Sequence, residues 1–201
     1  MLASPAMLAA PNTSAYSPCM TVTATKRLTK SDWLLAGLGA VVDVGPDALK
    51  AEPLARRLGT TKGSFYWHFK DVPAFHTELL ATWEMQVDDE LLEAPGEEST
   101  AAARLRRLAQ TITKRSTTMV PDPSIRAWAR SNRFAAQAVA RVDSRWLTSL
   151  QDHLADLGIG NPEMARIIYA AAVGMGDFGQ TSTCENTDAI GSLVDLVLAL
   201  R

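Results

Sequence analysis

The chain has 201 residues with a net charge of −2, and 47% of them are hydrophobic. This composition is typical of a globular protein with a substantial core. The sequence also argues against a membrane-spanning helix, since no apolar run approaches the ~18 residues that such a helix needs. Cys19 and Cys184 lie far apart, which argues against a structural disulfide or metal pair and favours a reducing cytoplasm.

The first 25 residues carry no charge and are rich in Ala, Ser, Thr and Pro. They lack the basic start of a signal peptide. We therefore expect a disordered tail over residues 1–25. Translation from Met1 and translation from Met20 both fit the sequence.

Residues 26–70 contain eight basic and four acidic side chains, a net charge of +4, whereas the rest of the chain carries −6. A basic N-terminal module on an acidic body is typical of a protein that binds a polyanion such as DNA. Ordinary solvated helix faces would produce the same charge, so charge alone leaves both interpretations open.

Three helices are expected in this basic module. Thr29 is a good N-cap for the first, and the Gly-Pro pair at 45–46 ends it. A second, short helix begins near Ala51 and ends at Gly59, a residue that suits a left-handed C-cap. Thr61 then caps a third helix. Two short helices joined by so tight a turn must cross steeply, which predicts a helix-turn-helix.

Helical periodicity continues to the C-terminus, and strand signals are scarce. We therefore predict an all-α fold, with an N-terminal helix-turn-helix domain over residues 26–70 and a larger helical body over residues 71–201. The helices expected in the body span about 71 to the low 90s, 99–119, 122–131, 135–157, 161–179 and 187–200.

The third helix belongs to the stretch "GTTKGSFYWHFKD", which is dense in aromatic residues. On a wheel at ~100° per residue, Phe65 and Phe69 share the side that packs on the first two helices. Tyr66 and Trp67 project elsewhere, next to Lys62. Such a surface suits the DNA major groove, because Lys bonds guanine edges and Tyr packs on thymine methyl groups. The alternative is that the exposed rings pack on the body.

Residues 50–75, "KAEPLARRLGTTKGSFYWHFKDVPAF", resemble the helix-turn-helix of the tetracycline-repressor (TetR) family of transcriptional regulators. The resemblance implies that Lys62, Gly63 and Tyr66 touch bases. It implies that Ser64, Trp67 and His68 touch phosphates. The complete set of DNA-binding residues that we expect is Lys50, Thr61, Lys62, Gly63, Ser64, Tyr66, Trp67, His68 and Lys70.

Two residues near the expected DNA surface do not suit a phosphate contact. Val72 stands where the family has a basic residue, and we expect Lys70 to replace that phosphate contact. Glu52, at the start of the second helix, would repel phosphate unless it accepts a hydrogen bond from a cytosine amine.

The resemblance implies that the last two helices pair with their copies in a second subunit to form a four-helix bundle. Apolar stripes with steps of three and four residues support this homodimer. The alternative is that both stripes belong to the core of one chain. The residues expected at the interface are Met164, Ile168, Ala171, Met175, Ile190, Val194 and Val197.

By the same resemblance, the middle helices hold a pocket for a small effector. The large apolar side chains available there suit an apolar or aromatic molecule. Each of them would serve equally well as plain core. The candidate lining residues are Trp83, Met119, Trp128, Phe134, Trp146, Met175 and Phe178.

These observations predict a homodimeric, ligand-responsive repressor that binds a palindromic operator and releases it when an effector binds. We find no Gly-rich phosphate loop, no paired His/Cys ligand spacing and no nucleophile–base constellation, so we expect no enzyme activity, no metal and no cofactor. The alternatives are an all-α enzyme and a non-regulatory DNA-binding or docking module.

Overall fold

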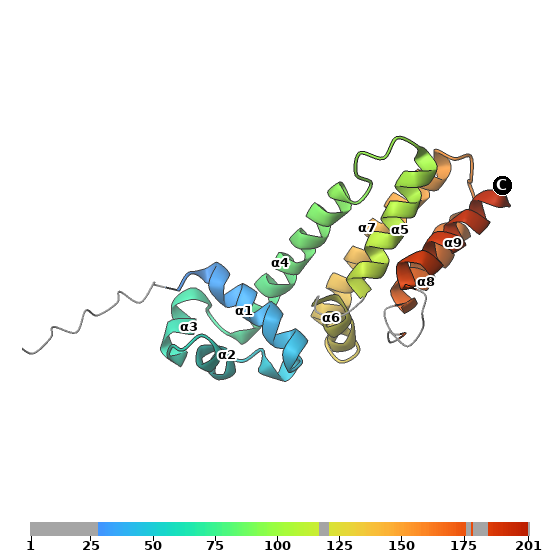
Figure 1. The fold of residues 1–201 in the computed structure, drawn as a ribbon. Helices are drawn as coiled ribbons and strands as arrows, with labels where there is room; N and C mark the ends of the chain where they lie inside the picture. The colour runs from blue at the N-terminus through green and yellow to red at the C-terminus, as the bar shows by residue number, and fades with distance from the viewer. Residues whose placement is uncertain (1–27, 117–120, 176–177, 179–184, 201) are drawn as a thin grey trace, which may run out of the picture.

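The computed structural model describes residues 28–116, 121–175, 178 and 185–200. Every regular element within these ranges is a helix, so the expected all-α fold is confirmed (Figure 1). The expected tail over residues 1–25 lies outside the described residues, as does the candidate pocket residue Met119. None of the helices in these ranges is long and apolar enough to cross a membrane.

The elements follow the sequence prediction closely, with small differences at the helix ends. Their bounds are α1 Lys30–Asp43, η1 Pro46–Ala48, α2 Ala51–Arg57, α3 Lys62–His68, α4 Val72–Glu93, α5 Ala101–Ser116, α6 Pro121–Ala129, α7 Arg133–Ala155, α8 Pro162–Gly174 and α9 Asn186–Ala199.

The helix ends of the N-terminal module are fixed by local hydrogen bonds. The Thr29 hydroxyl accepts from the backbone N–H of Asp32, and the Asp32 carboxylate accepts from the backbone N–H of Thr29, which is a capping box. The Thr61 hydroxyl accepts from the N–H of Ser64 and begins α3. Gly59 has φ +64°, the left-handed conformation expected in the turn between α2 and α3.

The core of the module is a cluster of aromatic rings. Phe65 is fully buried, and its ring meets that of Trp33 edge-on at 5.4 Å between centroids. The helical wheel placed Phe69 on the third helix, but α3 ends at His68 and Phe69 has an extended backbone. Phe69 is nevertheless buried, because its ring packs against Phe75 of α4 at 5.0 Å.

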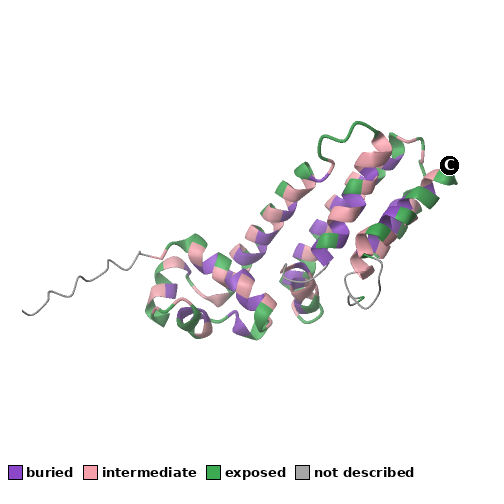
Figure 2. Ribbon diagram, viewed as in Figure 1, coloured by how far each residue is buried: buried purple, intermediate pink, exposed green. Residues whose placement is uncertain are grey.

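The module is joined to the body through α4, which α1 approaches closely. A Cβ atom on Gly37 would lie 2.7 Å from Phe75 Cζ and 2.8 Å from Leu79 Cδ1, so only glycine fits here without movement. In the body, α5 packs mainly on α8 and α9, and α7 packs on α4, α6 and α8 (Figure 1). The buried faces of these helices point toward one another (Figure 2).

Candidate nucleic-acid interface

Helix α3 buries one aromatic side chain and exposes the next two. Phe65 is fully buried, whereas Tyr66 is 47% exposed and Trp67 is 87% exposed. The prediction that these neighbouring rings would point in different directions is therefore confirmed. Lys62 and Gly63 are exposed on the same short helix. The exposure of Trp67 shows that its ring does not pack on the described part of the body, which was the alternative interpretation.

Gly63 has open space in front of it. A Cβ atom there would meet only Thr61 Oγ1, at 3.7 Å, which is ordinary contact. The packing of the protein itself therefore does not require glycine at this position. Close approach of an external partner to the start of α3 would require it.

A groove of about 400 Å³ runs between α2 and α3. Its lining residues are Lys50, Ala51, Glu52, Pro53, Arg56, Lys62, Tyr66 and Val72. The groove therefore brings two of the expected DNA contacts of α3, Lys62 and Tyr66, together with Lys50, the residue that precedes α2. It also contains Glu52 and Arg56, which sequence analysis did not include among the contacts.

The cations of this surface fall into two groups. Lys50 Nζ lies 3.2 Å from Asp47 Oδ1, and Arg56 Nη2 lies 3.4 Å from Glu52 Oε1. In contrast, Lys62 and Lys70 form no ion pair with any described residue and are exposed. The positive charge that is free to meet a polyanion is thus concentrated on α3 and the residues that follow it.

The remaining expected contacts lie around α3. Thr61 is exposed and Ser64 is partly exposed. His68 is half-buried, with its ring tilted against Trp33 at 6.4 Å between centroids. Val72 is half-buried at the first position of α4, where Asp71 caps the helix by accepting from the N–H of Ala74 at 2.7 Å.

His76 links the module to the body, a role that no sequence motif indicated. Its Nε2–H donates to the backbone carbonyl of Leu49, 2.9 Å away and just before α2. Its ring meets Trp128 of α6 edge-on at 5.0 Å. Burial lowers the pKa of His76 below its usual value, although the backbone hydrogen bond opposes that shift. One side chain of α4 therefore touches both α6 and the start of α2.

The candidate pocket residues do not form one group in the structure. Trp83, Trp146 and Trp128 are buried in the core. Phe134 and Phe178 are 49% and 67% exposed at the surface, and Met175 is half-buried. Trp83 has one unusual feature, because its buried indole N–H has no hydrogen-bond partner among the described residues.

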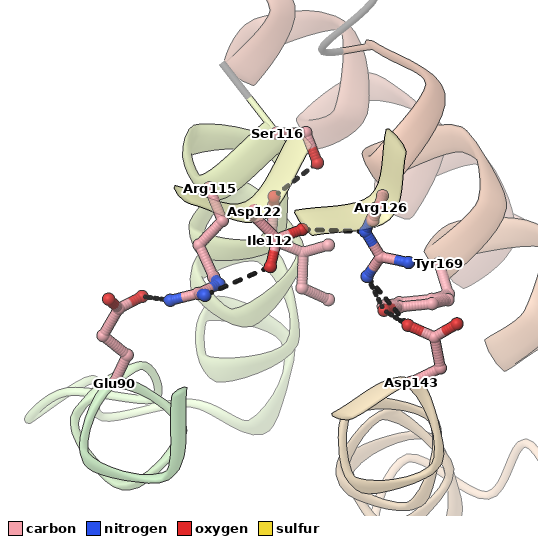
Figure 3. A network of polar contacts seen from close by, with 8 residues as sticks. All are labelled: Glu90, Ile112, Arg115, Ser116, Asp122, Arg126, Asp143 and Tyr169. Atoms are coloured by element: carbon pink, nitrogen blue, oxygen red, sulfur yellow. Dashed lines mark hydrogen bonds and ion pairs between the residues drawn. The ribbon is translucent and has the colours of Figure 1, made fainter. Parts of the chain in front are cut away.

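The core of the body contains a charged network that hydrophobic periodicity could not reveal (Figure 3). Asp122 is 3% exposed and accepts hydrogen bonds from Arg115 Nη2 at 3.2 Å and from Arg126 Nε at 2.8 Å. Arg126 also reaches Asp143 and the hydroxyl of Tyr169.

The same network extends to α4, because Arg115 is also paired with Glu90. It therefore joins α4, α5, α6, α7 and α8. Burial raises the pKa of Tyr169, with Asp143 acting in the same direction and Arg126 against it.

A second ionic cluster fastens α7 to α4. Glu84 accepts from Arg141 at 2.6 Å and from Arg145 at 2.5 Å, and Arg145 is also paired with Asp88. Burial acts to raise the pKa of Glu84, but the hydrogen bonds and charges of the two arginines outweigh it, so that the pKa lies below its usual value.

The predicted dimer stripes lie largely inside one chain. Ile168, Ile190 and Val194 are fully buried, because α8 and α9 pack on α5. Val197 is 7% exposed, whereas Met164, Ala171 and Met175 are half-buried. The large apolar residues that face outward are Ile167 on α8, Leu196 on α9 and Leu200 just after α9, which are 47%, 57% and 78% exposed.

A short helix with exposed Lys, Tyr and Trp, set behind a tight turn, defines a helix-turn-helix DNA-binding domain. Comparison with protein families agrees with this class. Residues 35–71 match the model of the bacterial regulatory proteins of the tetR family. Residues 35–71 are thus a TetR-type DNA-binding domain, and the resemblance seen in the sequence is confirmed. A search of curated proteins finds no match to the chain.

Solved structures show that most of the chain shares the fold of such regulators. A transcriptional regulator from Rhodococcus sp. Rha1 is 16% identical, with a TM-score of 0.67 over 86% of this chain and 95% of that one. A regulator from Saccharomonospora viridis in complex with choline is 15% identical, with a TM-score of 0.67 over 85% and 95%. FadR from Bacillus subtilis, in complex with stearoyl-CoA, is 14% identical, with a TM-score of 0.65 over 85% and 98%.

Proposed function

We propose that the protein is a cytoplasmic homodimeric repressor that binds a palindromic operator and releases it when a small effector binds to the body. The observation that carries the proposal is the surface of α3, where Lys62, Tyr66 and Trp67 are exposed around a buried Phe65. Contact between aromatic rings and water is unfavourable, and a binding partner that covers the rings removes it. A DNA duplex can cover them with thymine methyl groups and can pair its phosphates with the lysine.

In the proposed complex, Lys62 bonds a guanine edge and Tyr66 packs on a thymine methyl group, while Ser64, Trp67 and His68 contact the backbone. Lys62 and Lys70 are free of acidic partners within the described chain. Lys70 is the one of the two that is assigned to a phosphate, which gives at least two such contacts in a dimer. The logarithm of the association constant should then fall with the logarithm of salt concentration with a slope of about −2 or steeper.

The dimer is proposed to form through the outward faces of α8 and α9. Ile167, Leu196 and Leu200 are exposed there. Other faces of the two helices, which carry Ile168 and Val194, are buried against α5. A second copy would cover these side chains and produce a four-helix bundle. Such a dimer places two copies of α3 on successive turns of the major groove when they are ~34 Å apart.

Regulation by an effector is proposed from the relatives and from the junction at His76. Regulators of the same fold bind choline and stearoyl-CoA. In this chain, His76 touches Leu49, which lies just before α2, and Trp128 of α6. An effector that shifts α6 would therefore move α4 and change the separation of the two α3 helices.

The experiment that tests the function is a titration of the purified protein with labelled DNA flanking its own gene, alongside a scrambled duplex. We expect a preference of ~10³-fold or more for the native fragment at physiological salt. Light scattering of the complex should show two chains for each operator. Equal and weak binding to both duplexes, together with a monomer in solution, would contradict the proposal. A panel of small molecules added to the preformed complex tests the effector: release by at least one is expected.

A further inference from the structure

Three cations of the N-terminal module are held by acidic residues of the same module. The pairs are Lys50 with Asp47, Arg56 with Glu52, and Arg57 with Asp43, at 3.2, 3.4 and 2.6 Å respectively. All six side chains are at least 40% exposed. Exposed pairs of this kind contribute little to stability, so a stabilising role alone does not account for them.

Among the three acidic partners, only Glu52 lines the groove between α2 and α3. It lies there with its partner Arg56 and with Lys62 and Tyr66, the expected base contacts of α3. Asp43 and Asp47 lie outside that lining set. The side chain of Glu52 is 69% exposed. A carboxylate therefore stands on the surface that DNA would meet.

A carboxylate in this position weakens the attraction of the groove for phosphate in two ways. It repels phosphate directly, and it occupies Arg56, which would otherwise release a counterion on contact with the backbone. Binding to DNA of any sequence depends on this electrostatic attraction, because such complexes lack matched base contacts. The penalty applies wherever the carboxylate meets a phosphate or a base acceptor.

At the operator, base contacts from Lys62 and Tyr66 fix the register of the protein, so that Glu52 meets one particular base pair. The major groove presents two amine donors, cytosine N4 and adenine N6. The cytosine amine suits a carboxylate better, because the adenine amine stands beside the acceptor N7, which repels a negative charge. A cytosine at that position therefore offsets the penalty most fully. A repulsive carboxylate gives specificity only if the operator relieves the repulsion and other DNA sequences do not.

We propose that Glu52, together with Arg56, is a specificity-determining pair that suppresses binding to non-operator DNA and selects a cytosine in each half-site. This inference rests on the proposed function, since it presupposes that α3 reads an operator. It extends the function by assigning discrimination to α2, outside the recognition helix.

The test is a comparison of Glu52→Gln with the wild-type protein on the operator and on a scrambled duplex, over a range of salt concentrations. Glutamine keeps the size of the side chain and removes its charge. We expect tighter binding to scrambled DNA and a specificity ratio lower by about tenfold, within the range of a single base contact. The salt dependence on scrambled DNA should become steeper by about one counterion per protomer.

Two further variants assign the effect to the pair. Adding Arg56→Gln to Glu52→Gln should remove the extra salt dependence, because no released arginine remains. Asp43→Asn is the matched control: it frees Arg57 of the same helix and changes the charge equally, but it lies outside the groove. The control should leave the specificity ratio within about twofold of wild type, well below the effect of a base contact.

The outcomes separate this inference from the function on which it rests. The proposed role of Glu52 is wrong if wild-type protein prefers the operator and Glu52→Gln has the same specificity ratio. It is also wrong if Asp43→Asn lowers the specificity ratio as much as Glu52→Gln does. In both cases the proposed function stands. If wild-type protein has no preference for any fragment, both are wrong. Replacing each operator base pair in turn should show one symmetric position whose discrimination Glu52→Gln abolishes; retention at every position overturns the selection of cytosine.

Discussion

Replacing Asp122 with Asn removes the central acceptor of the buried network without changing the size of the side chain. Asp122 is 3% exposed and accepts from both Arg115 and Arg126. Asparagine has only one acceptor oxygen, and its amide would turn a donor toward one of the arginines. Arg126 keeps Asp143 and Tyr169, but Arg115, which is 5% exposed, keeps only Glu90 among the described residues.

Breaking a buried ion pair by removing one partner costs about 3–5 kcal/mol, because an uncompensated charge stays buried. For a domain of this size the melting temperature should fall by ~6–20 °C. Urea unfolding followed by circular dichroism measures the change, with an unchanged m value expected. Asp47→Asn breaks an exposed pair and should cost about 1 kcal/mol or less. A cost for Asp122→Asn as small as that of the control would refute the argument that this network holds the body together.

Three other substitutions test separate parts of the structure. Gly37→Ala should lower the free energy of unfolding by about 1–3 kcal/mol, because the added methyl would lie 2.7 Å from Phe75; an unchanged urea midpoint would show that the ring moves freely. The lowered pKa of His76 means that the unfolded chain binds its proton at higher pH than the folded chain, so stability should fall as pH drops below about 6.5. His76→Gln should flatten that part of the pH profile measured by urea unfolding, and an unaltered slope would assign it to other groups. Leu196→Glu should yield a folded monomer by light scattering, whereas Leu92→Glu, also exposed but on α4, should remain dimeric; a Leu196→Glu dimer would place the interface elsewhere.

The structure could be predicted best from the sequence in the helix-turn-helix segment, where local residues determine both the packing and the exposed surface. In α3, the separation of Phe65 from Tyr66 and Trp67 follows from helical geometry alone, because adjacent residues point ~100° apart. Caps at Thr29 and Thr61 and the left-handed Gly59 were equally predictable, since their effects are local. Even there, the wheel extended the helix one residue too far, to Phe69.

The body was less predictable, because its features depend on contacts between distant segments. The stripes that contain Ile168 on α8 and Val194 on α9 have the period of an interface, yet α5 covers both within one chain. Periodicity cannot tell which of two helix faces a partner covers. The network around Asp122 was equally hidden, since charged residues are ordinarily assigned to the surface. Only the tertiary structure shows that Arg115 and Asp122 are buried together.

The central claim is that α3 reads DNA sequence, and the most direct test is the specificity ratio of Lys62→Ala and Tyr66→Phe. Arg107→Ala is the control, because it removes an exposed cation from α5 of the body. We predict that Lys62→Ala lowers the preference for the operator by about 5–100-fold, the cost of one good base contact. Tyr66→Phe should keep the ring contact with a methyl group and lose at most the smaller contribution of its hydroxyl. Arg107→Ala should leave the preference unchanged. A preference that survives Lys62→Ala intact, or that falls equally with Arg107→Ala, would contradict the account.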